Sequence, residues 1–99
     1  MARFDIYAAV KGNGYLLDVQ SDLLEPLNTR VVVPLLPKSK APRPADRLNP
    51  EFHINQVDHV MVTQFLAAVP LKLLSHPVDN LSLHSEEIKA AIDMLTHGF

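Results

Sequence analysis

The chain has 99 residues, and its 47% hydrophobic and 20% charged residues are typical of a folded globular protein, so we expect a single domain over residues 1–99. The lack of cysteine excludes disulfides and thiolate zinc sites and favours a reducing compartment, and the net charge of −2 argues against bulk nucleic-acid binding. No apolar run is long enough to span a bilayer and the N-terminus lacks a signal-peptide layout, so we expect a cytoplasmic protein without membrane contact.

The first third of the chain predicts a β-hairpin followed by a strand that contains proline. Alternating apolar residues over 4–10 and 15–20 predict two half-buried strands, with a glycine-containing turn at 11–14. A β-branched run over 30–36 includes Pro34. Because proline cannot donate a ladder hydrogen bond, we place this strand at a sheet edge or a bulge.

The middle of the chain predicts a long loop, a second hairpin and a last strand. Residues 37–50 are rich in proline and lack periodicity, which is typical of a loop or flap. Residues 52–54 and 59–64 predict two paired strands around a turn at 55–58, and residues 69–74 predict the final strand.

The C-terminal residues 85–99 have helical periodicity. Ser82 and Ser85 are both acceptable N-caps, and Gly98 is well placed to end the helix. Several antiparallel strands followed by one helix predict a mainly β fold, a small β-barrel or sandwich with one packed helix.

Signatures of catalysis, metal binding and cofactor binding are weak. Two of the five histidines, His53 and His59, are spaced to face each other across the second hairpin, but no metal-ligand motif is present, so we expect no metal. Asp18, Asp22 and Glu25 are candidate acid–base groups, although carboxylates at strand ends more often cap turns. With three glycines and no phosphate-binding loop, NAD, ATP and other cofactors are not expected.

Two segments favour contact with another protein. Leu23 and Leu24 occupy a loop, where they either plug the core or form an interface patch. Four basic residues lie in the proline-rich segment, which is either a solvated loop or a docking site for an acidic partner segment. These residues are Lys38, Lys40, Arg43 and Arg47. A small core with many apolar residues also favours homodimerisation.

Several segments resemble the CcdB family of toxins. The most specific is Leu17-Asp18-Val19-Gln20-Ser21-Asp22-Leu23-Leu24, followed by Thr29-Arg30-Val31-Val32-Val33-Pro34-Leu35. Val69-Pro70-Leu71, Asp79-Asn80-Leu81-Ser82 and Glu87-Ile88-Lys89-Ala90-Ala91-Ile92-Asp93 also resemble the family, and the similarity weakens between Pro37 and Pro50.

The resemblance implies a cytoplasmic homodimer with an SH3-like antiparallel β-barrel, a small wing sheet and a C-terminal helix. It implies a non-enzymatic toxin for plasmid maintenance or of chromosomal origin, which binds the A subunit of DNA gyrase and traps its cleaved-DNA complex. A CcdA-like antitoxin would neutralise it. The complex would repress its own operon as a transcriptional autoregulator, with DNA bound only through the antitoxin.

By the same resemblance, the gyrase-binding surface comprises Leu23, Leu24, Asp93, Thr96, His97, Gly98 and Phe99. The best-known members carry tryptophan where this chain has His97, a smaller ring with weaker cation–π capacity. We assign antitoxin binding to Lys38, Lys40, Arg43 and Arg47 on charge alone. Two alternatives stay open: an endoribonuclease toxin of the MazF/PemK type, which shares the barrel, and a degenerate homologue that binds antitoxin without killing.

Overall fold

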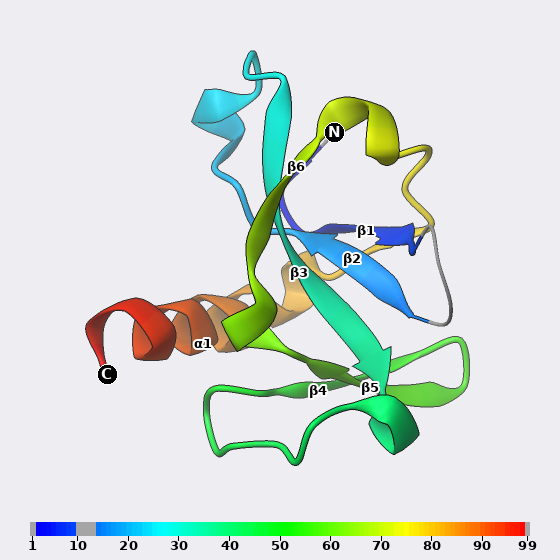
Figure 1. The fold of residues 1–99 in the computed structure, drawn as a ribbon, viewed down its shortest axis with the longest axis vertical. Coiled ribbons are helices and arrows are strands. Elements are labelled where there is room, and N and C mark those ends of the chain that lie inside the picture. Colours follow the sequence, from blue (N-terminus) through cyan, green and yellow to red (C-terminus); the bar gives the residue numbers. More distant parts are fainter. Residues whose placement is uncertain (1, 10–13, 99) are drawn as a thin grey trace.

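A computed structural model describes residues 2–9 and 14–98 of the chain (Figure 1). Within these residues, seven strands form one antiparallel sheet: β1 (Asp5–Ala8), β2 (Tyr15–Asp18), β3 (Thr29–Pro37), β4 (Glu51–Ile54), β5 (Val57–Met61), β6 (Ala67–Pro70) and β7 (Asp79–Asn80). Short 3₁₀ helices connect them: η1 (Asp22–Leu24), η2 (Lys38–Lys40), η3 (Thr63–Phe65), η4 (Leu71–Leu73) and η5 (Ser82–His84). The chain then enters one α-helix, α1 (Ser85–His97).

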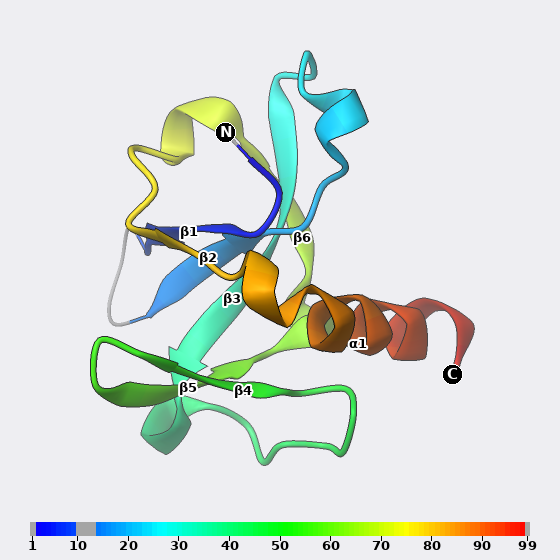
Figure 2. The same ribbon diagram turned by 180° about the vertical axis from the view of Figure 1, so that it is seen from behind.

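The sheet is curled into a half-barrel, and α1 packs across it. Its strand order is β4-β5-β3-β2-β1-β7, with β6 paired to the first half of β3. Figures 1 and 2 show α1 crossing the sheet near its middle, while β3 and β6 extend away from it as a two-stranded arm. The expected mainly β fold with one C-terminal helix is confirmed.

Strand β3 is the centre of the sheet, so its predicted place at an edge or bulge is wrong. It pairs with β2 along one side, and on the other side with β6 through Val32 and with β5 from Leu35 onward. The carbonyl oxygen of Pro34 accepts a hydrogen bond from the Val62 N–H at 3.0 Å on that second side. The missing N–H of Pro34 therefore falls where the partner changes from β6 to β5, so no ladder hydrogen bond is lost.

The first hairpin is confirmed by the pairing of β1 with β2, but β1 is not half-buried as predicted. Its neighbouring residues Ile6 and Tyr7 are both fully buried. Ile6 belongs to the main core, whereas Tyr7 packs on the other face with Val32 and Leu74. The alternation was misleading because this part of the sheet is covered on both faces. Residues 11–13 of the predicted turn, and Val10 of the strand predicted before it, lie outside the described residues.

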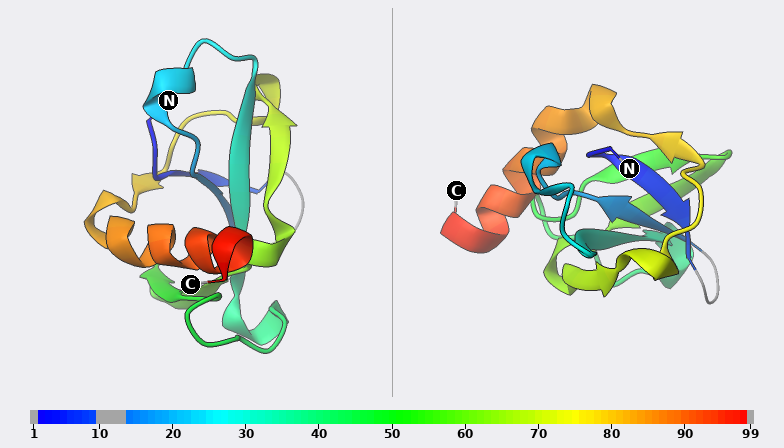
Figure 3. Two further views of the ribbon diagram at one scale, coloured as in Figure 1. Left: turned by 90° about the vertical axis from the view of Figure 1, so that its left-hand side faces the viewer. Right: turned by 90° about the horizontal axis from the view of Figure 1, so that it is seen from above.

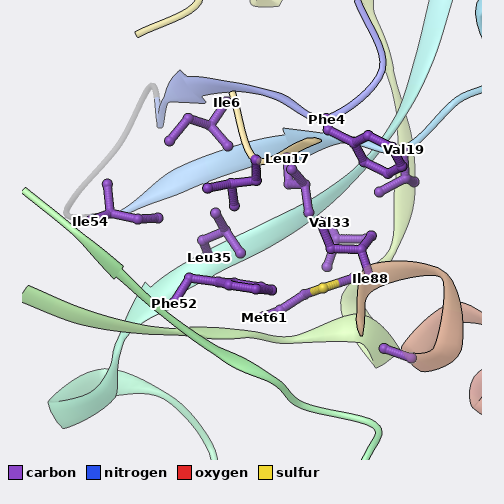
Figure 4. Packing of buried hydrophobic residues seen from close by; sticks show 12 residues of the cluster. Phe4, Ile6, Leu17, Val19, Val33, Leu35, Phe52, Ile54, Met61 and Ile88 are labelled. Atoms are coloured by element: carbon purple, nitrogen blue, oxygen red, sulfur yellow. The ribbon is translucent and has the colours of Figure 1, made fainter. Parts of the chain in front are cut away.

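The main core fills the space between the curled sheet and α1 (Figure 4). Its buried members come from β1, β2, β3, β4, β5 and α1 and from the segments beside them: Phe4, Ile6, Leu17, Val19, Val33, Leu35, Phe52, Ile54, Met61, Leu81, Ile88 and Ala91. From α1, Ile88 and Ala91 are completely buried. This contact fixes the direction in which the helix leaves the sheet.

The second hairpin is confirmed, with a tighter turn than predicted. Only Asn55 and Gln56 separate β4 from β5, and both have positive φ, at 51° and 67°. That geometry belongs to a two-residue type I′ turn, whose twist matches that of paired strands.

The expected last strand over residues 69–74 is only partly correct. Strand β6 begins at Ala67 and ends at Pro70, and the next three residues form η4. The expected helix is confirmed, but neither Ser82 nor Ser85 is its N-cap. His84 holds that position and makes no side-chain capping bond. Gly98 ends the helix in the left-handed conformation, with φ at 80°.

Candidate functional site

The turn after β2 carries two leucines outward. Leu23 is 91% exposed and Leu24 is 48% exposed, so they do not plug the core and the interface interpretation is favoured. The turn is built by side chains at its start. The hydroxyl of Ser21 accepts a hydrogen bond from the Leu23 N–H at 3.2 Å, and the carboxylate of Asp22 accepts one from the Arg3 N–H at 2.9 Å.

Beneath this turn lies a buried ion pair. The Nε and Nη2 atoms of Arg30 lie 2.8 and 2.6 Å from Oδ2 of Asp18, and both side chains are almost fully buried. Burial raises the pKa of the Asp18 carboxyl, against the opposing effect of Arg30. Asp18 is thus engaged inside the fold rather than presented to a substrate, so the acid–base interpretation finds no support at this residue.

Gln20 links this pair to the turn, and it was not among the residues predicted from the sequence. Its carboxamide Nε2 donates to the carbonyl oxygen of Leu24, and its Oε1 accepts from the Val31 N–H, each at 3.1 Å. A signal was present in the sequence: Asp18 and Gln20 are two polar residues on the same face of the strand predicted over residues 15–20. Polar groups in such a position must find partners when they are buried.

The other predicted gyrase-binding residues lie at the end of α1. Asp93, Thr96, His97 and Gly98 are all exposed. The Gly98 N–H donates to the carbonyl oxygens of Asp93 and Met94, each at 3.1 Å, so the backbone is ordered to this point. Phe99, also assigned to this surface, lies outside the described residues.

The structure brings these two predicted groups to one side of the molecule. In Figure 1, η1 and the C-terminal end of α1 both lie on the left. The left view of Figure 3, which looks directly at that side, shows η1 above the helix. We call the predicted gyrase-binding residues at these two places the leucine–helix surface: Leu23, Leu24, Asp93, Thr96, His97 and Gly98.

The four basic residues lie elsewhere, around η2 and the loop that follows it. Lys38 forms an ion pair with Glu51 at 3.2 Å, while Lys40 and Arg43 are exposed. Arg47, at φ 66°, lines a cavity of about 630 Å³ between this loop and α1, together with three carboxylates. These carboxylates belong to Asp46, Glu51 and Glu87. In Figure 1, η2 is at the lower right, away from the end of α1.

The histidine prediction on the second hairpin is wrong. The register pairs His53 with Asp58 and His59 with Phe52, so the two imidazoles do not oppose each other. The two side chains of the first pair lie 2.9 Å apart. Among residues 2–9 and 14–98, no group of three or more His, Asp or Glu side chains is arranged to hold a metal ion.

Comparison with known protein families matches residues 3–98 to the CcdB protein family. The chain belongs to the CcdB family. The match covers nearly the whole chain, including η1, the loop after η2 and all of α1. Membership of this family, whose members are non-enzymatic gyrase poisons, indicates a CcdB-like toxin. None of the helices in the part of the chain that the structure describes is both long and apolar enough to cross a membrane.

Proposed function

We propose that this chain is the toxin of a toxin–antitoxin pair that binds the A subunit of DNA gyrase and traps its cleaved-DNA complex. The observation that carries the proposal is the leucine–helix surface: two exposed leucines and the exposed end of α1 on the same side of a CcdB family fold. Exposed apolar side chains next to polar ones are typical of a protein-binding patch.

The hydrophobic effect would drive the proposed binding, because contact with gyrase removes the apolar surface of Leu23 and Leu24 from water. Leu23 and Leu24 are already displayed on a hydrogen-bonded turn, so little conformational entropy remains to be lost on binding. His97 replaces the tryptophan of the best-known members, which reduces the apolar area available for stacking. We therefore expect a weaker gyrase poison than a tryptophan-bearing relative.

The proposed antitoxin is CcdA-like, and we place an acidic segment of it against the loop after η2. All four basic residues are exposed, and Lys40 and Arg43 support this assignment best because Lys38 and Arg47 lie near carboxylates of the same chain. The proposal includes a cytoplasmic homodimer of single-domain chains. It also includes repression of the operon by the toxin–antitoxin complex, with the antitoxin contacting DNA.

Expression of the chain without antitoxin tests the proposal against both alternatives. We expect growth arrest with covalent gyrase–DNA complexes and intact RNA. Specific RNA cleavage without such complexes would instead support an endoribonuclease toxin. Normal growth together with tight antitoxin binding would support a homologue that no longer kills.

Two variants test the end of α1. Deleting Gly98 and Phe99 should abolish toxicity while leaving the fold and antitoxin affinity intact, because both residues follow the last helical turn and only the capping hydrogen bonds of Gly98 are lost. His97→Trp should strengthen gyrase binding by restoring a larger aromatic face. Unchanged toxicity of the truncated chain would remove this end from the proposed surface.

Charge reversal tests the proposed antitoxin loop. Replacing Lys40 and Arg43 with glutamate should weaken antitoxin binding and make it less sensitive to salt, because an acidic partner would be repelled. Lys72→Glu, at an exposed lysine of η4, is the matched control. An unchanged dissociation constant for the double variant would contradict the assignment.

A further inference from the structure

Gln20 is a buried residue that joins two segments of the proposed gyrase-binding turn. Only 6% of it is exposed. Its carboxamide donates to the Leu24 carbonyl oxygen at the end of η1 and accepts from the Val31 N–H in β3. One side chain therefore ties the outgoing turn to the central strand of the sheet.

The backbone of Gln20 is itself held in place. Its N–H donates to Oδ1 of Asp18 at 3.0 Å, while Oδ2 of the same carboxylate binds Arg30. Asp18 and Arg30 are fully buried in β2 and β3. The carboxamide thus projects from a rigid base, and rigid support is what a preorganised binding loop requires.

The bond to Leu24 closes the turn. The Leu24 carbonyl oxygen also accepts from the Leu27 N–H at 3.1 Å, and the Leu24 N–H donates to the Ser21 carbonyl oxygen at 3.0 Å. Every one of these bonds lies within residues 20–27, beside the two exposed leucines. Loss of the Gln20 donor would leave this turn held mainly by exposed, local hydrogen bonds, which open readily.

We propose that Gln20 is the positioning residue of the gyrase-binding surface: its carboxamide fixes the turn that presents Leu23 and Leu24. This inference rests on the proposed function, since it assigns a role within the same surface. Gln20 touches no partner in this scheme. It acts by keeping the turn in its binding-competent, closed conformation. The apparent Kd for gyrase is the Kd of the closed form divided by the fraction of molecules in which the turn is closed, so loss of the Gln20 bond raises the apparent Kd.

The variant that tests this is Gln20→Glu. Glutamate has nearly the same shape and keeps an acceptor for the Val31 N–H, but its ionised form has no donor and places negative charge against the Leu24 carbonyl oxygen. Asn49→Asp is the matched control, because Asn49 is also a carboxamide with 6% exposure. It bonds to Ala45, Met61 and Gln64, so it anchors the loop before β4 instead of η1.

Two quantities are measured on folded protein: the Kd for the gyrase A subunit, and hydrogen exchange of the Leu24 and Leu27 amides. For Gln20→Glu we expect roughly tenfold weaker gyrase binding, which corresponds to a turn that is open about nine-tenths of the time, and therefore exchange of these amides close to the unprotected rate. Antitoxin binding should remain unchanged. For Asn49→Asp we expect wild-type gyrase binding and wild-type exchange at both amides.

Acidification adds a readout that a general loss of stability would not produce. Once protonated, the carboxyl group introduced by Gln20→Glu regains an O–H donor for Leu24, so the protection of the turn amides should return as the pH falls. Equal gyrase affinities of Gln20→Glu and wild type would overturn the positioning role alone. Equal weakening by Gln20→Glu and Asn49→Asp would also overturn it. No binding by the wild-type chain would instead overturn the proposed function, and the positioning role with it.

Discussion

Replacing Leu23 with alanine should weaken gyrase binding while leaving the free energy of unfolding nearly unchanged. The side chain is 91% exposed, so its truncation should alter stability by no more than about 0.5 kcal/mol. Burying a leucine side chain against a partner is worth about 1.5–3 kcal/mol. Alanine keeps one of its four side-chain carbons, so we expect a loss of about 1–2 kcal/mol, a roughly 5- to 30-fold rise in Kd.

The matched control is Leu83→Ala. Leu83 is 97% exposed and lies on η5, which comes directly before the N-terminal end of α1 and so at the end of the helix away from the leucine–helix surface. Isothermal titration calorimetry with the purified gyrase A subunit measures Kd for both variants, and chemical denaturation measures their stability. Equal gyrase affinities of the two variants would refute the predicted role of Leu23, and so would a loss of affinity in Leu23→Ala that only follows its loss of stability.

Three further predictions concern the fold and its titrating groups. Asp18→Asn should destabilise the chain by about 3–5 kcal/mol in urea denaturation, because Arg30 keeps a buried charge without its counter-ion. Tyr7→Phe should be neutral or slightly stabilising, since the buried hydroxyl has no hydrogen-bond partner among the described residues; a loss above about 1 kcal/mol would contradict this. The hydrogen bond with His53 lowers the pKa of Asp58. A lowered pKa means that this carboxylate stabilises the folded state above its unfolded pKa and loses that effect as the pH falls through its folded pKa. Because His53→Ala removes the hydrogen bond, the pKa of Asp58 should rise in an NMR titration of that variant.

The elements that the sequence predicted best were those with a local cause. The period of α1 and its glycine stop are readable in neighbouring residues, and both were confirmed. Pro34 was misjudged because the cost of its missing N–H depends on where β6 gives way to β5. That boundary is set by residues far along the chain, so no local pattern reveals it.

In the candidate site, too, features with a local cause could be predicted from the sequence and features set by distant residues could not. Leu23 and Leu24 in a predicted loop left two interpretations open, a core plug and an interface patch, and their exposure in the structure favours the interface patch. The support beneath that turn was not predicted, because the bond from Gln20 to Val31 joins residues that are separated along the chain. The basic cluster looked uniform in sequence, yet Lys38 lies 3.2 Å from Glu51 and Arg47 lines a cavity with carboxylates.

A hydrogen-exchange footprint of the chain bound to the gyrase A subunit tests the central claim most directly. We expect slowed exchange over residues 21–27 and 93–98, with no change over residues 38–47. Protection confined to residues 38–47, or no protection at any concentration of gyrase, would contradict the proposal that the leucine–helix surface binds gyrase.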